Sequence, residues 1–82
     1  MIELFSLRGC PFCAKVEAKL DELGVAYERQ EVPRARANRD QVEEISGQRG
    51  VPVLVDPEHD VSGMPESDDI VAYLQETYGE EA

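Results

Sequence analysis

The first half of the chain carries an apolar run, a segment with helical periodicity and a second strand-like run. Residues 2–7 are apolar at most positions, which favours a strand buried on both faces. Apolar side chains then recur at helical spacing from about Pro11 to Leu23, and Gly24 is a suitable residue to end that helix. Residues 25–32 start with β-favouring side chains and become polar, as expected of a solvated strand at a sheet edge. Together they predict a right-handed βαβ unit.

The second half predicts a helix, a hairpin and a final helix. The first of these helices is expected from Asn38, as its N-cap, to Ser46, with Gly47 ending it. Residues 52–55 form a short apolar strand, and a turn at Asp56–His59 leads to an outer strand around 60–62. After a further turn at 63–65, the last helix is expected from Glu66 to Tyr78. The predicted order is β-α-β-α-β-β-α.

Length and composition limit the class of protein. A chain of 82 residues is expected to form one domain, residues 1–82, with a small core. Two cysteines and the single His59 cannot supply four zinc ligands, and a hairpin turn accounts for His59 beside Asp56 and Asp60, so no metal site is expected. No secretory leader or membrane-spanning apolar run is visible, which makes the cytoplasm the expected location.

The net charge of −10 argues against nucleic acid or an anionic membrane as a partner, because their phosphates would be repelled. Eighteen acidic residues against eight basic ones give an acidic, halophilic-type surface, as in proteins from salt-loving organisms. An ordinary acidic soluble protein is the alternative interpretation.

The candidate chemistry lies at Cys10-Pro11-Phe12-Cys13, between the first strand and the first helix. A Cys-x-x-Cys pair at such a junction is typical of thiol–disulfide redox sites. With Cys10 at the N-cap and Pro11 at the first helical position, the Cys10 sulfur faces free backbone N–H groups and the positive end of the helix dipole. We therefore expect Cys10 to be an ionised nucleophile and Cys13, one turn on, to be its shielded resolving partner.

Three motifs together resemble the glutaredoxin family: Cys10-Pro11-Phe12-Cys13, Gly50-Val51-Pro52 and Ser67-Asp68-Asp69-Ile70. The resemblance covers nearly the whole chain. It implies an α/β, thioredoxin-like fold with a four-stranded mixed sheet flanked by three helices. Pro65-Glu66 stands where most glutaredoxins have Gly-Gly, and this string is more similar to the glutathione-binding N-terminal domain of glutathione transferases.

The resemblance also implies a substrate-binding site. The Val51-Pro52 bond is expected to be cis and to face Cys10, leaving the Val51 backbone free to pair with a peptide-like thiol. Ser67 and Asp68, at the start of the last helix, would bind a γ-glutamyl carboxylate and ammonium group. Phe12 provides an apolar wall. Arg39 matches a family position that contacts the glycyl carboxylate, and Arg8 is a looser candidate for that role, with surface solubility as the alternative for both.

The resulting expectation is a small glutaredoxin-type thiol–disulfide oxidoreductase for redox homeostasis. Cys10 would attack protein or low-molecular-weight mixed disulfides, and Cys13 or a second small thiol would resolve the product. No tightly bound cofactor is expected, and glutathione or γ-glutamylcysteine would be the co-substrate. Expected partners are disulfide-containing proteins and an upstream reductase or thiol pool, with the chain a monomer. Two alternatives remain: a [2Fe–2S] cluster carrier, and a transferase-like domain that binds a thiol without turnover.

Overall fold

The computed structural model describes residues 1–79, so the last three residues of the expected domain, 80–82, lie outside it. Two single-turn 3₁₀ helices, Arg36–Asn38 (η1) and Pro57–His59 (η2), complete the regular structure. The elements follow the predicted order, which is thereby confirmed. They are β1 (Ile2–Ser6), α1 (Pro11–Leu23), β2 (Tyr27–Glu31), α2 (Asp40–Ser46), β3 (Val53–Asp56), β4 (Val61–Met64) and α3 (Ser67–Tyr78).

The four strands form one mixed sheet in the order β2-β1-β3-β4. β1 pairs parallel with β2 and antiparallel with β3, and β3 pairs antiparallel with β4. The expected edge position of the second strand is confirmed, because β2 lies at one edge and β4 at the other. β1 therefore lies inside the sheet, and it carries the chain directly into the Cys10 loop.

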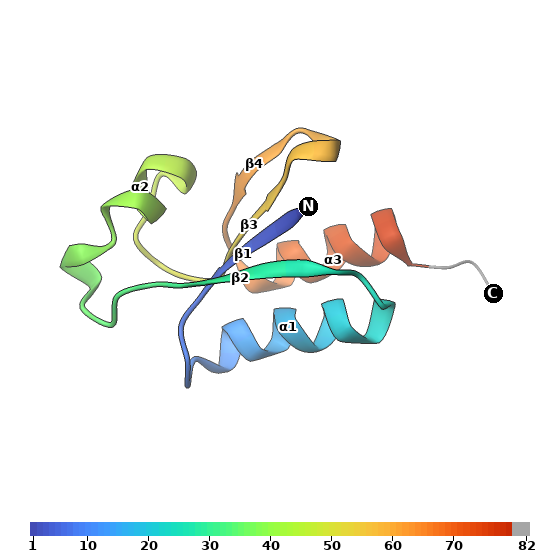
Figure 1. Ribbon diagram of the computed structural model, residues 1–82, viewed down its shortest axis with the longest axis horizontal. Helices are drawn as coiled ribbons and strands as arrows, with labels where there is room; N and C mark the ends of the chain where they lie inside the picture. The colour runs from blue at the N-terminus through green and yellow to red at the C-terminus, as the bar shows by residue number, and fades with distance from the viewer. Residues whose placement is uncertain (80–82) are drawn as a thin grey trace.

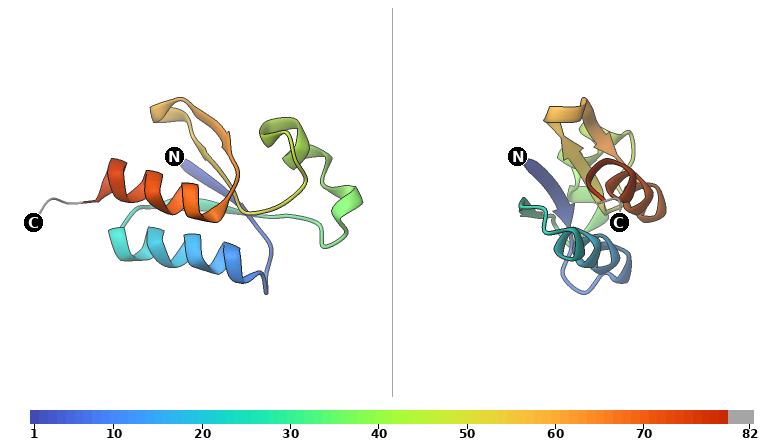
Figure 2. Two further views of the ribbon diagram at one scale, coloured as in Figure 1. Left: turned by 180° about the vertical axis from the view of Figure 1, so that it is seen from behind. Right: turned by 90° about the vertical axis from the view of Figure 1, so that its right-hand side faces the viewer.

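Helices cover the sheet on both faces, with α1 and α3 side by side on one face and α2 on the other (Figures 1 and 2). The alternation of side chains along each strand divides the core in the same way. Under α1 and α3, Leu4 of β1 and Leu54 of β3 lie opposite each other in the antiparallel ladder, fully buried. Phe5 and Val53, the neighbouring pair, face α2 and pack with Val42.

The boundaries of α1 were predicted correctly, and Gly24 ends the helix in the left-handed conformation (φ 69°). The predicted start of the second helix was wrong. Asn38 closes the 3₁₀ turn η1 instead of capping α2, and Arg39 occupies the N-cap position without a side-chain capping bond. Arg39 cannot cap the helix because a guanidinium has only N–H donors and no acceptor for the free N–H groups, and its donors bind backbone carbonyls, as described below.

The other corrections concern one or two residues at the ends of elements. β2 begins at Tyr27, because Val25 and Ala26 belong to the turn after α1. Gly63 and Met64, expected in a turn, belong to β4, and α3 begins at Ser67 instead of Glu66. None of the helices within residues 1–79 has the length and apolar character needed to cross a membrane.

A buried carboxylate ties the hairpin to α3. Asp56, at the end of β3, is only 1% exposed, and its Oδ2 accepts hydrogen bonds from the hydroxyls of Tyr73 (2.6 Å) and Tyr78 (2.5 Å). His59 Nδ1 lies 3.0 Å from the same oxygen. Burial alone would raise the pKa of Asp56, but these three hydrogen bonds outweigh it and hold the pKa below the ordinary value of 3.8.

We predict that Asp56→Asn lowers the free energy of unfolding by about 1–3 kcal/mol at neutral pH, because charge-assisted bonds to a buried carboxylate are lost. Because the folded-state pKa of Asp56 is depressed, its contribution is present above the ordinary value of 3.8 and is lost as the pH falls through the folded-state pKa. The difference between the two proteins should therefore shrink in acid, as measured by denaturant unfolding across pH.

The matched control is Asp60→Asn. Asp60 is exposed and has a left-handed backbone (φ 61°), a conformation that asparagine also tolerates. Its substitution should leave stability nearly unchanged. Equal losses in the two variants, or a loss for Asp56→Asn that does not depend on pH, would contradict this assignment of the Asp56 cluster.

Candidate active site

The loop between β1 and α1 places Cys10 at the start of the helix, as predicted. Gly9 adopts a positive φ of 88°, and the Cys10 N–H donates to the Leu7 carbonyl at 3.1 Å. Cys10 is the N-cap residue and Pro11 follows at the start of the helix. Backbone N–H groups in this first turn have no helical partner, so the missing N–H of Pro11 removes no helical hydrogen bond. The backbone N–H of Cys13 donates to the Cys10 Sγ at 3.4 Å.

These surroundings favour the thiolate of Cys10. Partial burial acts to raise its pKa, but hydrogen bonds from the Cys13 thiol and from the backbone N–H groups of Cys13 and Phe12 act the other way. The positive charge of Arg39 adds to the stabilisation of the anion. The pKa of Cys10 consequently lies below its ordinary value of 9.0.

Cys13 has the opposite character. It lies on the inner face of α1, is 1% exposed and is not bonded to Cys10 as a disulfide in this structure. Burial raises the pKa of the Cys13 thiol to about 11, and the adjacent Cys10 adds to that shift. The backbone N–H of Leu7 and the hydroxyl of Ser6 act the other way and partly oppose this rise in pKa. One sulfur is thus poised as a nucleophile, and the other is held protonated beside it.

Five of the predicted binding residues surround one hollow of about 280 Å³, here called the Phe12 hollow. The expected cis bond between Val51 and Pro52 is confirmed. The exposed Phe12 side chain lies on one side of the hollow, and the start of α3 lies on another. Its lining consists of Phe12, Gln48, Gly50, Val51, Pro52, Glu66, Ser67 and Asp68.

At the start of α3, Ser67 and Asp68 lie at the first two helical positions. Ser67 is 9% exposed and does not cap the helix, because the N-cap residue is Glu66, with a positive φ of 71° and no side-chain capping bond. Asp68 is exposed and forms an ion pair with Lys15 of α1. The free N–H groups of this helix end make the hollow suited to a carboxylate.

Arg39 does not line the Phe12 hollow, and its hydrogen bonds give it a structural role. It is 7% exposed, and its guanidinium donates to the carbonyls of Pro33 (2.8 Å), Arg34 (3.1 Å) and Arg49 (3.1 Å). These bonds cross-link the two loops that flank η1 and α2. The surface role considered for Arg39 is therefore wrong, and its effect on Cys10 is that of a nearby buried charge.

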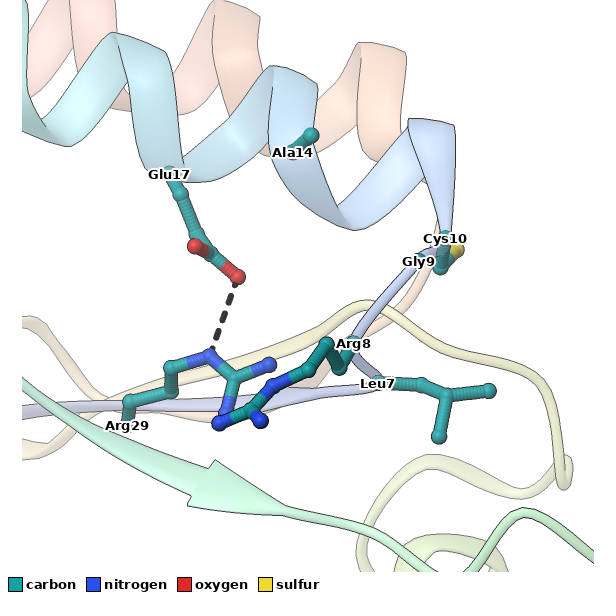
Figure 3. Close-up of a pocket in the computed structure, with 7 residues that line it drawn as sticks. All are labelled: Leu7, Arg8, Gly9, Cys10, Ala14, Glu17 and Arg29. Carbon is teal, nitrogen blue, oxygen red and sulfur yellow. Dashed lines mark hydrogen bonds and ion pairs between the residues drawn. The ribbon is translucent and has the colours of Figure 1, made fainter.

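Arg8 lies on the other side of the nucleophile, in a second hollow of about 290 Å³ that we call the Cys10 hollow. This hollow is lined by Leu7, Arg8, Gly9, Cys10, Ala14, Glu17 and Arg29 (Figure 3). The exposed Arg8 side chain extends beside Arg29 of β2 (Figure 3). Arg8 and Arg39 were proposed for the same carboxylate, but they line different hollows.

Sequence reasoning assigned no binding role to Gln48, Gly50 and Glu66, which line the Phe12 hollow, or to Glu17 in the Cys10 hollow. Gly50 belongs to the recognised motif Gly50-Val51-Pro52 and Glu66 directly precedes Ser67, so the position of both along the chain could have identified them. Glu17 carries no such signal, because it appears in the sequence as one more acidic residue on a helix. Within residues 1–79 no group of three or more His, Cys, Asp and Glu side chains is arranged to hold a metal ion.

Comparisons with known proteins agree on one family. The family model for the glutathione S-transferase N-terminal domain matches residues 4–82. Glutathione transferase E6 from Drosophila melanogaster superposes with a TM-score of 0.85 at 28% identity, covering 99% of this chain and 36% of its own. A glutathione S-transferase from the Antarctic clam Laternula elliptica gives 0.84 at 26% identity, covering 96% and 36%.

Glutaredoxin 2 from Salmonella typhimurium, solved in complex with glutathione, superposes with a TM-score of 0.83 at 26% identity, covering 98% of this chain and 35% of its own. The chain thus spans about a third of the length of these solved proteins. A search of curated protein sequences gave no match. The expected resemblance to glutaredoxins and transferase N-terminal domains is confirmed, and so is the thioredoxin-like α/β fold.

The pKa values of the two thiols are predicted to lie on opposite sides of the ordinary value of 9.0. In Cys13→Ser, where only Cys10 remains, the alkylation rate with iodoacetamide should rise through a midpoint below 9.0. In Cys10→Ser the midpoint for Cys13 should stay above 9.0, because burial is the largest cause of its shift. Rates measured across pH by mass spectrometry provide the test, and a Cys10 midpoint at or above 9.0 would refute the described electrostatics.

Proposed function

The chain belongs to the family of glutathione S-transferase N-terminal domains, and from this premise we propose that it is a glutaredoxin-type thiol–disulfide oxidoreductase. The observation that carries the proposal is the pairing of a Cys10 pKa below the ordinary value with a buried Cys13 held protonated beside it. Binding of a thiol alone would need no second sulfur at this place. Disulfide exchange uses both.

The proposed reaction has two exchange steps. The Cys10 thiolate attacks one sulfur of the substrate disulfide, forming a Cys10 mixed disulfide while the other sulfur leaves as a thiolate and takes a proton from water. Cys13, or a second small thiol, then attacks Cys10 Sγ and displaces the bound group as a thiol. The first route leaves a Cys10–Cys13 disulfide in the protein, and the second returns the free Cys10 thiolate directly.

The Phe12 hollow is the proposed site for the small thiol, glutathione or γ-glutamylcysteine. The similar glutaredoxin 2 from Salmonella typhimurium was solved in complex with glutathione. A γ-glutamyl carboxylate would accept hydrogen bonds from the N–H groups at the start of α3 and from Ser67. The ligand's ammonium group would replace Lys15 as the partner of Asp68, and the backbone of Val51 would pair with the peptide part of the thiol.

The biological setting follows from this chemistry as part of the proposal. Substrates would be disulfide-containing proteins and mixed disulfides, and a reductase or thiol pool would restore the reduced protein. Such exchange fits a reducing cytoplasm. A monomer would leave the Cys10 side of the molecule open to protein substrates.

A second candidate function comes from the family itself, in which most of the similar structures are transferases. In a transferase-type reaction the bound thiol, instead of Cys10, would attack an electrophile such as an aryl halide. The Phe12 hollow would serve the same ligand in that case. The two functions differ in whether Cys10 is required, which makes them separable by substitution.

We predict that the parent protein reduces a small mixed disulfide with glutathione or γ-glutamylcysteine as reductant, at low or molar salt. Cys10→Ser should fall to the uncatalysed background, because the nucleophile is removed. Cys13→Ser should retain turnover by the route that uses a second small thiol. Steady-state disulfide reduction by the three proteins is the measurement. No turnover by any of them, or aryl-halide conjugation that persists in Cys10→Ser, would favour the transferase-type alternative.

A second prediction concerns the ligand's ammonium group. Asp68→Asn should raise the KM for glutathione by roughly 1.4- to fivefold with little change in kcat, since an exposed ion pair contributes about 0.2–1 kcal/mol. Asp69→Asn is the matched control, because Asp69 lies in the same first turn of α3 but outside the lining of the Phe12 hollow. Equal effects of the two substitutions would attribute the change to the helix dipole instead of to ligand binding.

A further inference from the structure

The loop that carries Cys10 is attached to β2 by a carboxylate. β1 and β2 pair in register up to Ser6 and Glu31, the last residue of each strand. Glu31 Oε2 accepts a hydrogen bond at 3.1 Å from the backbone N–H of Arg8, two residues beyond the end of β1. Among residues 1–79, this carboxylate is the acceptor for that N–H. The Glu31 side chain thus continues the pairing of β1 and β2 into the loop.

Arg29 holds the Glu31 carboxylate in that position. Its guanidinium forms an ion pair with the other carboxylate oxygen of Glu31, Oε1. Arg29 Nε also lies 3.2 Å from Oε2 of Glu17 on α1, and this ion pair is drawn in Figure 3. The same oxygen of Glu17 accepts a hydrogen bond of 2.6 Å from the hydroxyl of Ser6, which is fully buried. Arg29 and the two carboxylates therefore join the end of β1, the helix α1 and the loop between them.

The attached loop is short, so its shape decides where Cys10 lies. Residues 7–9 separate β1 from the N-cap of α1. Gly9 turns the chain with a φ of 88°, and the Cys10 N–H donates to the Leu7 carbonyl at 3.1 Å. Arg8 lies at the centre of this turn, so a hydrogen bond to its N–H restrains the turn as a whole.

We propose that Glu31 is a positioning residue for the nucleophile. Its hydrogen bond to the Arg8 N–H holds the loop in the shape that keeps the Cys10 sulfur against the free N–H groups of α1. This inference rests on the proposed oxidoreductase function, in which Cys10 is the nucleophile. Glu31 lines neither the Phe12 hollow nor the Cys10 hollow, so it acts through the backbone of the loop.

Glu31 is ionised at neutral pH. A hydrogen bond from the Arg29 side chain and one from the Arg8 backbone hold its pKa below the ordinary value of 4.5, and the charges of both arginines add to this effect. Glu17 faces Glu31 across Arg29, and Arg39 lines a hollow together with Glu31. A substitution of Glu31 by a neutral residue therefore removes a full negative charge.

The loss of this charge and the loss of the hydrogen bond have opposite effects on Cys10. A carboxylate near a thiol disfavours the thiolate and raises the pKa of that thiol. If Glu31 acted only as a charge, its removal would lower the pKa of Cys10. If Glu31 positions the loop, its removal raises the pKa of Cys10, because the sulfur moves away from the N–H groups that stabilise the thiolate.

The test measures this sign directly. The variants are made in the Cys13→Ser protein, where Cys10 is the one remaining thiol, and iodoacetamide alkylation across pH gives its midpoint. Glu31→Ala removes both the charge and the acceptor, whereas Glu31→Gln removes the charge but keeps an acceptor oxygen. Glu28→Ala is the matched control, since Glu28 is an exposed carboxylate on the same strand that is bonded to the side chain of Gln30 instead.

The midpoint of Cys10 should rise by roughly 0.4–1 pH unit in Glu31→Ala, about a 2.5- to tenfold change in the thiolate equilibrium, which is the scale of one hydrogen bond. Glu31→Gln should lie closer to the Cys13→Ser reference, and Glu28→Ala should match it. A midpoint that stays or falls in Glu31→Ala overturns the positioning role. So does an equal rise in Glu31→Gln or in Glu28→Ala.

Reduction of a small mixed disulfide, by proteins that retain both cysteines, separates this inference from the proposed function. At neutral pH Glu31→Ala should turn over more slowly than the parent, and Glu28→Ala should keep the parent rate. Turnover by the parent with an unchanged Cys10 midpoint in Glu31→Ala overturns the positioning role and leaves the oxidoreductase function standing. A parent without turnover contradicts the function, while the alkylation midpoints still decide whether Glu31 positions Cys10.

Discussion

The arrangement of the site depends on where α1 begins. Cys10 at the N-cap, with Pro11 after it, directs a sulfur at the free N–H groups of the first helical turn. The same register turns Cys13 inward, where burial keeps it protonated. A shift of the helix start by one residue would remove both effects at once, because the two cysteines would leave their outer and inner positions together.

The rest of the fold holds that helix start in place. β1 lies inside the sheet and delivers the chain to the Cys10 loop, while Leu4 and Leu54 pack beneath α1 and α3. On the opposite face, Arg39 cross-links the loops around α2 through three backbone carbonyls and places its charge near Cys10. The chain has a net charge of −10, but the buried charge that acts on Cys10 is the positive one of Arg39.

Much of the fold was predictable from the sequence, and the predictions that failed share a physical cause. The register of α1 followed from local signals, namely Cys10-Pro11 at its start and Gly24 at its end. The predicted start of α2 was wrong. Asn38 has a side chain that suits the N-cap position, but in the structure Arg39 occupies that position and is held there by hydrogen bonds to backbone carbonyls of the flanking loops. Tertiary contacts override local preference in such cases, and no periodicity reveals them.

The features of the candidate site divide in the same way, into those set by local sequence and those set by tertiary contacts. Short motifs identified the two cysteines, the cis bond and the start of α3, because each of these features is local in the chain. The hydrogen bond from the Ser6 hydroxyl to Glu17 and the bonds from Tyr73 and Tyr78 to Asp56 join residues 11 or more positions apart. Acidic residues are so common in this chain that composition could not single out Glu17 and Asp56.

The most direct test of the central claim is to identify the cysteine that receives a small thiol. Each single-cysteine variant, Cys13→Ser and Cys10→Ser, is incubated with oxidised glutathione at neutral pH, and peptide mass mapping locates the adduct. The account predicts one glutathionyl group on Cys10 in the first variant and none on the buried Cys13 in the second. An adduct on Cys13, or none on Cys10, would contradict the assignment of Cys10 as the nucleophile.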